Sequence, residues 1–206
     1  MKLLFVKGSP RGTSSQSSNV VEAALAAYRS KNPAAMIDEI DLWQTPLPEF
    51  DGDRAAAKMS FFGEGTLEGA RKTAWDEIVA ITRRFTNADD YLFTVPMWNG
   101  GIPYRLKLYI DIITQPGLLF GFDPVAGYSG LLKGKRATVV YTSGVYAPGV
   151  PPAFGTDHHS TYFDDWLRLI GVTDISTVRF QPTLLTNDVA GGLKRARSEA
   201  TKAGAR

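Results

Sequence analysis

Short runs in which nearly every residue is apolar recur along this chain. Such runs are typical of strands that are buried on both faces of a parallel sheet, and each is too short to be a helix of ordinary length. The clearest is 3–6, and a partly alternating run at 36–42 has the period of a strand. Together these patterns predict strands at 3–6, 36–42, 90–95, 137–141 and 172–180.

Between these runs the apolar positions follow the 3.6-residue period of an amphipathic helix. This period predicts helices over 20–28, 66–85, 104–113, 163–170 and 188–203. Asn187 precedes the last of them and is a favourable N-cap. Residues 43–65 are expected to be irregular, because prolines and glycines interrupt them.

Strands that alternate with helices predict βαβ units, a parallel sheet and right-handed crossovers. Five strands suit the flavodoxin-like order 2-1-3-4-5, a three-layer α/β sandwich that binds its ligand beyond the carboxyl ends of the strands. Residues 116–134 hold aromatic residues among glycines and are expected to form a hairpin-like excursion. We expect a single domain over 1–206.

Composition narrows the function. The chain has no cysteine, which excludes disulfides, iron–sulfur clusters and a thiol nucleophile and fits a cytoplasmic location. A net charge of +2 argues against nucleic-acid binding. The apolar run at 3–6 is too short for a signal peptide or a membrane span. His158 and His159 are adjacent and point in different directions on a helix, so no metal site is expected.

The polar segment 8–18 joins the first strand to the first helix and is rich in serine. A helix N-terminus presents unpaired N–H groups to an anion, and serine hydroxyls add donors, so this segment is a candidate phosphate site. It contains neither a P-loop nor a Gly-x-Gly-x-x-Gly motif. The same serines are equally typical of helix capping; their place at the first β–α junction favours phosphate binding.

The segment 96–103 directly follows the third strand, at the same edge of the sheet. Met97 and Trp98 offer an apolar surface to a flat ring, and Asn99 offers hydrogen bonds to a polar ring edge. The glycines that follow let the main chain approach a ligand closely. A plain strand-to-helix loop with a packed tryptophan is the alternative.

These residues carry a resemblance to a known family. Ser9 with the run 15–17, the segment 96–99, and the spacing Pro103-x-x-Leu106-Lys107-x-x-x-Asp111 are together similar to the FMN-dependent NADH-azoreductases and related NAD(P)H quinone reductases. The resemblance covers essentially the whole chain. We interpret Lys107 and Asp111 as an ion pair on one helix face.

The resemblance implies where FMN would bind. Its phosphate would be held by Ser9, Ser15, Gln16 and Ser17. Its isoalloxazine would lie against Pro96, Met97, Trp98, Asn99 and Gly100. Its pyrimidine side would be closed by Thr142, Ser143, Gly144 and Val145.

The helix at 163–170 is apolar nearly all round, which predicts a subunit interface. The resemblance also implies a homodimer, in which aromatic residues of one chain complete the substrate pocket of the other. Phe120, Phe122 and Trp166 are the candidates for that wall, with core packing as the alternative.

The implied activity is a two-electron ping-pong reaction, in which NADH or NADPH and then a quinone, azo or nitroaromatic acceptor use one shared site. The flavin carries the chemistry, so no catalytic residue is assigned; Asn99 and Tyr146 are candidate helpers. Two alternatives stay open: a flavodoxin-type electron carrier that does not oxidise NAD(P)H, and a small-molecule binder or hydrolase without flavin.

Overall fold

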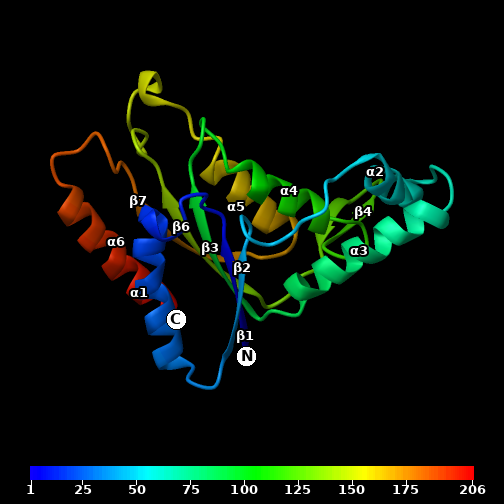
Figure 1. Ribbon diagram of the computed structural model, residues 1–206, viewed down its shortest axis with the longest axis horizontal. Coiled ribbons are helices and arrows are strands. Elements are labelled where there is room, and N and C mark those ends of the chain that lie inside the picture. The colour runs from blue at the N-terminus through cyan, green and yellow to red at the C-terminus, as the bar shows by residue number, and fades with distance from the viewer.

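A five-stranded parallel sheet forms the centre of the molecule in this computed structural model, which describes residues 1–206 apart from the side chain of Thr13 (Figure 1). Its order is β2-β1-β3-β6-β7. The strands are β1 (Lys2–Lys7), β2 (Met36–Asp41), β3 (Asp90–Pro96), β6 (Arg136–Thr142) and β7 (Asp174–Phe180). Neighbouring strands pair in parallel, so the predicted order 2-1-3-4-5 is confirmed.

Helices cover both faces of this sheet (Figure 1). On one face lie α1 (Gln16–Lys31) and α6 (Val189–Gly204), which pack with Leu3 and Phe5 of β1. On the other face lie α3 (Gly69–Thr86), α4 (Tyr104–Ile113) and α5 (Ser160–Leu169), which pack with Leu4 and Val6. Alternate residues of one strand therefore enter two cores, which explains the uninterrupted apolar run. Among the described helices, none combines the length and apolar character needed to cross a bilayer.

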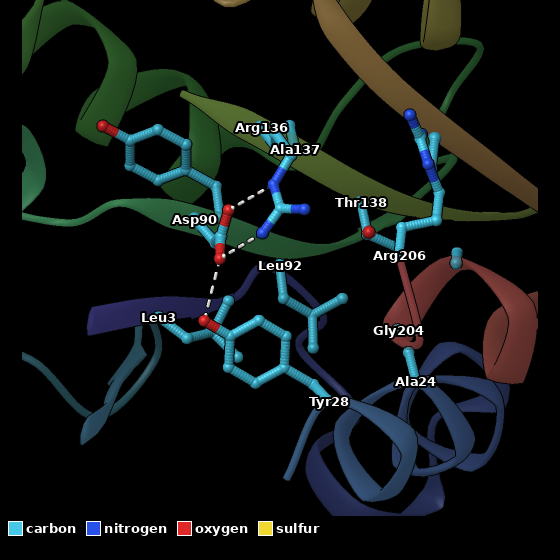
Figure 2. Close-up of a pocket in the computed structure, with 13 residues that line it drawn as sticks. Leu3, Ala24, Tyr28, Asp90, Leu92, Arg136, Ala137, Thr138, Gly204 and Arg206 are labelled. Carbon is cyan, nitrogen blue, oxygen red and sulfur yellow. Dashed lines mark hydrogen bonds and ion pairs between the residues drawn. The ribbon is translucent and has the colours of Figure 1, made fainter. Parts of the chain in front are cut away.

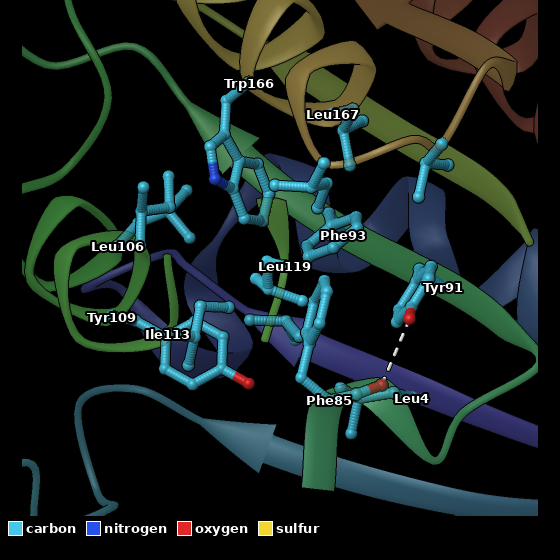
Figure 3. Close-up of a cluster of buried hydrophobic side chains, with 14 of the residues drawn as sticks. Leu4, Phe85, Tyr91, Phe93, Leu106, Tyr109, Ile113, Leu119, Trp166 and Leu167 are labelled. Atoms are coloured by element: carbon cyan, nitrogen blue, oxygen red, sulfur yellow. Dashed lines mark hydrogen bonds between the residues drawn. The ribbon is translucent and has the colours of Figure 1, made fainter. Parts of the chain in front are cut away.

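The core beneath α3, α4 and α5 is strongly aromatic (Figure 3). The Phe85 ring stacks on Tyr91 with centroids 4.4 Å apart, and Phe93 lies edge-on to Phe163 at 5.0 Å. The Tyr91 hydroxyl donates to the Phe85 carbonyl at 3.1 Å, which satisfies the one polar atom of that buried side chain.

Several elements differ from the predictions, including one helix that was not expected, the start of α3 and the N-cap of α6. Residues 43–65, expected to be irregular, contain α2 (Gly52–Met59), whose N-cap Asp51 accepts a hydrogen bond from the Arg54 N–H at 3.1 Å. The next helix, α3, begins at Gly69 rather than at 66. The N-cap of α6 is Asp188, whose carboxylate accepts from the Gly191 N–H at 2.9 Å, so the prediction of Asn187 was wrong.

Short 3₁₀ helices occur at the ends of loops: η1 (Gly12–Ser14), η2 (Ser60–Phe62) and η3 (Pro152–Phe154). The segment 116–134 contains an antiparallel pair, β4 (Phe120–Asp123) and β5 (Gly127–Gly130). The Asp123 carboxylate closes their turn by accepting from the N–H groups of Val125 and Ala126 at 2.8 and 2.7 Å. The hairpin lies beside α2, with the Lys58 ammonium 5.7 Å from the centre of the Phe120 ring.

Candidate functional site

The two loops singled out in the sequence begin side by side at the carboxyl edge of the sheet. Strands β1 and β3 are paired with Lys7 opposite Thr94. The Gly8 N–H donates to the Thr94 carbonyl and hydroxyl, both at 3.1 Å. A Cβ at Gly8 would lie 2.5 Å from the Thr94 carbonyl oxygen, so only glycine allows this approach.

The serine loop presents hydroxyl groups at the N-terminus of α1. Ser15 is the N-cap, but its hydroxyl does not cap the helix; its Oγ lies 2.8 Å from Ser17 Oγ. Ser9, Ser15 and Ser17 are buried, with 6%, 2% and 0% of their surfaces exposed. The first N–H groups of any helix lack partners within the helix. Together with these hydroxyls, they form a cluster of donors suited to a phosphate.

The turn after β3 is a two-residue hairpin turn. The Trp98 N–H donates to the Gly101 carbonyl at 2.8 Å, and the Gly101 N–H donates back at 3.0 Å. The central residues Asn99 and Gly100 both have left-handed backbones, with φ of 50° and 81°. Asn-Gly is the favoured pair for such a turn. Asn99 therefore shapes the main chain, a role that the sequence analysis missed although the Asn-Gly pair signals it.

The loop after β6 adjoins this turn. The Met97 N–H donates to the Thr142 carbonyl at 2.7 Å, which continues the β3–β6 ladder beyond Pro96. Thr142 and Ser143 are buried, each with 5% of its surface exposed. The Ser143 hydroxyl donates to the Tyr146 carbonyl at 2.5 Å. This hydroxyl is therefore hydrogen-bonded within its own loop, so the loop would contact a ligand through its main chain.

The loop that follows β7 is hydrogen-bonded to the same segment. The N–H groups of Thr183 and Leu184 donate to the carbonyls of Ser143 and Gly144, both at 2.9 Å. A Cβ at Gly144 would lie 2.9 Å from Leu184 Cδ1, so the glycine admits this leucine. Val145 is 38% exposed at the loop tip. The sequence could not predict these hydrogen bonds from residues 183–184, because they join two loops that are far apart in the chain.

A cleft of about 920 Å³ opens beside the turn. Its walls are mainly aromatic and aliphatic, with a few polar groups, as is usual for small-molecule sites. The lining residues are Pro10, Trp43, Phe50, Trp98, Asn99, Gly101, Ile102, Pro103, Tyr104, Lys107, Leu108, Asp111, His158 and Tyr162. The cleft therefore joins the serine loop, the end of β2, the turn after β3, and α4 and α5.

Four aromatic residues of this cleft were not predicted: Trp43, Phe50, Tyr104 and Tyr162. The Trp43 ring meets Tyr104 edge-on at 5.2 Å, and its Nε1 donates to the Gly8 carbonyl at 3.1 Å. The position of Trp43 directly after β2 was the available signal, since β2 is paired with β1 and ends at the same edge of the sheet.

Comparison with known proteins agrees with this architecture. The flavodoxin-like fold family matches residues 1–203. The chain belongs to this flavodoxin-like family. It is 54% identical over 202 residues to a Ruegeria pomeroyi protein named FMN-dependent NADH:quinone oxidoreductase, covering 98% of this chain and 99% of that protein. A Desulfotalea psychrophila protein of the same name is 43% identical over 183 residues, covering 89% and 86% of the two chains.

Solved structures give the same picture of this flavodoxin-like protein. An azoreductase from Bacillus anthracis superposes with a TM-score of 0.89 at 25% identity, covering 100% of this chain and 99% of that one. A second structure from that species, described as an FMN-dependent NADH-azoreductase in complex with FMN, has a TM-score of 0.85, also at 25% identity and with the same coverage.

The aromatic candidates for a substrate wall lie in two places, Trp166 on α5 and both Phe120 and Phe122 on β4. Trp166 is 4% exposed, in the core between Phe93 and Leu106 of Figure 3, and its Nε1 donates to Thr114 Oγ1 at 2.9 Å. Of the two interpretations, core packing holds for Trp166. Phe120 is 5% exposed, whereas Phe122 is 52% exposed on the hairpin.

Helix α5 is amphipathic rather than apolar nearly all round, because Phe163, Trp166 and Leu167 are buried whereas Thr161, Asp165 and Arg168 are exposed. One side of α5 faces the sheet, and Gly171 at its end packs against Gly130 so closely that a Cβ on Gly130 would lie 2.2 Å from the Gly171 nitrogen. The Leu132 N–H donates to the Ile170 carbonyl at 3.0 Å. These contacts lie at the C-terminal end of α5, and Leu169 remains 36% exposed, so the subunit interface expected at this helix stays a prediction.

Lys107 and Asp111 line the cleft, whereas Tyr146 lies outside it and lines a separate pocket with Asp157 and Arg179. Lys107 and Asp111 form the predicted ion pair on the rim, with Nζ and Oδ1 2.6 Å apart. The Tyr146 hydroxyl lies 3.5 Å from the Asp157 carboxylate. Burial, and next the charge of Asp157, raise the pKa of Tyr146, so its phenol stays protonated and can donate a hydrogen bond.

Proposed function

We propose that this chain is a single flavodoxin-like domain, a three-layer sandwich, that binds FMN and reduces quinones and azo compounds with NADH or NADPH. The observation that carries the proposal is the meeting of a donor-rich helix N-terminus and a tight Asn-Gly turn beside one aromatic cleft. The names of the relatives, FMN-dependent NADH:quinone oxidoreductase and FMN-dependent NADH-azoreductase, support it.

The residues present fit FMN. The helix N-terminus with Ser9, Ser15, Gln16 and Ser17 would hold the phosphate, because buried hydroxyls and main-chain N–H groups suit a dianion. The segment 96–100 would lie against the ring, and the loop 142–145 would close its pyrimidine side through the main chain. When bound, FMN supplies hydride acceptance and two-electron transfer to the acceptor.

The chain's own residues bind and orient the substrates. Trp98, Trp43 and Tyr104 offer apolar faces and edges that suit flat aromatic molecules such as quinones, azo and nitroaromatic compounds. The Asn99 amide lies in the cleft wall, where it can donate to a substrate oxygen. Tyr146 keeps its proton but lines a separate pocket with Asp157, so it stays a candidate helper outside the cleft itself. We propose that donor and acceptor use this one cleft in turn, in a ping-pong order.

We further propose a homodimer in the cytoplasm. Phe122 and Tyr128 are 52% and 64% exposed on the hairpin, with ring centroids 5.0 Å apart. Large exposed aromatic residues at adjacent positions are typical of interfaces. In a dimer, this hairpin would complete the cleft of the partner, and Phe122 would be its wall residue.

The proposal is tested by the visible spectrum of the purified protein and by NADH oxidation with a quinone. We expect bound flavin and quinone-dependent NADH consumption. Protein that binds FMN but does not consume NADH or NADPH would instead be an electron carrier. Protein that takes up no FMN on reconstitution would contradict the flavin assignment itself.

A further inference from the structure

Two adjacent histidines hold the two ends of the turn after β3. The main-chain N–H of His158 donates to the Gly100 carbonyl at 3.1 Å. The ring of His159 is fully buried, and its Nε2 lies 2.5 Å from the Val95 carbonyl oxygen. The segment that reaches the turn comes from just before α5, 64 residues further along the chain than Val95.

The contact with Val95 falls near the carboxyl end of β3, where the strand is still paired with β6 through Val95 and Pro96. The next residue is Pro96, which has no N–H, so the carbonyl is the only hydrogen-bonding group of the Val95–Pro96 peptide unit. A carbonyl only accepts hydrogen bonds, so Nε2 of His159 must carry the proton. Burial lowers the pKa of His159, which keeps the ring neutral with Nδ1 unprotonated.

The position of His159 is itself fixed by its surroundings. The Asp157 carboxylate accepts from the N–H groups of His159 and Ser160 at 3.1 and 2.7 Å. The imidazole meets the Tyr141 ring edge-on at 4.8 Å. Arg179 lies 5.1 Å from the centre of the same ring and donates to Ser160 Oγ at 3.0 Å. Strands β6 and β7 and the start of α5 therefore hold the histidine in one orientation.

We propose that His159 is a positioning residue that clamps the turn 96–101 through the Val95 carbonyl, together with the main chain of His158 at Gly100. The clamp shapes the turn before any ligand binds. The consequence for flavin affinity rests on the proposed function, but the clamp can be measured without flavin.

The test compares three variants by hydrogen–deuterium exchange of the flavin-free protein. His159→Leu keeps an apolar side chain but removes the donor, and we expect the amides of Met97, Trp98 and Gly101 to exchange about tenfold faster, the effect of one lost hydrogen bond. His159→Gln places an amide N–H where Nε2 was and is expected to restore exchange to nearly the wild-type rate. Tyr141→Phe removes a hydroxyl that donates to Asp164 at 2.6 Å but keeps the ring against His159, and it should leave the turn unchanged.

A second measurement is the dissociation constant of FMN, read from flavin fluorescence. We expect about tenfold weaker binding for His159→Leu and recovery for His159→Gln. The clamp is overturned if the turn amides of His159→Leu exchange at the wild-type rate. It is also overturned if the amides of His159→Gln exchange as fast as those of His159→Leu. Equal acceleration in Tyr141→Phe would show general loosening and also overturns it. If the wild-type protein binds no FMN, the proposed function fails, while the exchange rates still decide the clamp.

Discussion

The two ends of the central sheet use polar groups in opposite ways. At the amino end, Asp90 accepts two hydrogen bonds from the Arg136 guanidinium at 2.8 and 2.9 Å and one from the Tyr28 hydroxyl at 2.8 Å (Figure 2). These groups border a cavity of only about 30 Å³, room for about one water molecule. At the carboxyl end, aromatic and aliphatic side chains with a few polar groups, among them the Asn99 amide, border a cleft of about 920 Å³.

The difference separates structural polar groups from those available to a ligand. Asp90, Arg136 and Tyr28 satisfy one another, and burial, followed by the hydrogen bond to Asp90, raises the pKa of Tyr28 so that it stays a donor. At the carboxyl end, the Ser15 hydroxyl leaves its helix uncapped, and the Asn-Gly turn presents its side chains to the cleft. A buried charge network is therefore weaker evidence of a binding site than donors that face an opening.

The largest effect is expected at the serine loop. Replacing Ser15 and Ser17 together by alanine should weaken FMN binding by about 100-fold or more, because each removes a hydrogen bond to a charged phosphate. The free energy of unfolding of the flavin-free protein should change little. Isothermal titration with FMN measures the change, and Ser30→Ala, at the exposed far end of α1, is the control. Undiminished affinity would place the phosphate elsewhere.

At the amino end the expected effect is on stability alone. Asp90→Asn weakens the bonds to Arg136 and Tyr28 and should lower the free energy of unfolding by about 2 kcal/mol. Urea unfolding measures this, while the FMN dissociation constant and NADH turnover stay at wild-type values. A matching loss of flavin affinity would contradict the separation of the two ends.

The carboxyl end should also give stability a pH dependence. Burial lowers the pKa of His159 below its usual 6.5, and this effect outweighs all the others. The hydrogen bond to the Val95 carbonyl and the charges of Asp157 and Asp164 raise this pKa, whereas the charge of Arg179 lowers it. The unfolded chain therefore binds a proton first as pH falls below about 6.5, so stability decreases there, by at most about 1.4 kcal/mol per pH unit. His159→Gln should flatten this slope in unfolding curves measured between pH 7.5 and 5. An unchanged slope would assign the titration to another group.

The turn allows backbone and side-chain roles of Asn99 to be separated. Asn99→Ala forces alanine into a left-handed backbone and should destabilise the protein by about 1 kcal/mol, whereas Asn99→Gly should not. Both remove the amide, so both should lower quinone turnover if the amide contacts substrate. Thermal unfolding and steady-state rates of the two variants decide this. Turnover that falls only in Asn99→Ala would leave the residue with a turn role alone.

The smallest effect is expected for the rim ion pair. Lys107→Met or Asp111→Asn should change the free energy of unfolding by about 0.2–0.5 kcal/mol, since the two side chains are 46% and 38% exposed. The double variant should differ little from either single one. A change above about 1 kcal/mol would show that the pair does more than stabilise α4.

Much of the fold was predictable because periodicity reports burial directly. Apolar and partly alternating runs identified the five strands of the sheet, and their alternation with helices indicated the flavodoxin-like order. Helix α2 was missed, since the glycine and prolines around it conceal a short helix that begins at a good N-cap, Asp51. Asn187 and Asp188 are both good caps, and only the backbone geometry chose between them.

For the site, the sequence by itself determined the two loops and the Asn-Gly turn, because local residue chemistry fixes a helix N-terminus and a left-handed backbone. Only the tertiary structure decided that Trp166 belongs to the core, that Trp43 enters the cleft, and that His159 holds Val95. The local sequence around an aromatic residue or a histidine is the same whether its side chain lies in the core or at the cleft. Its role depends on partners distant in sequence, and chain folding alone brings those together.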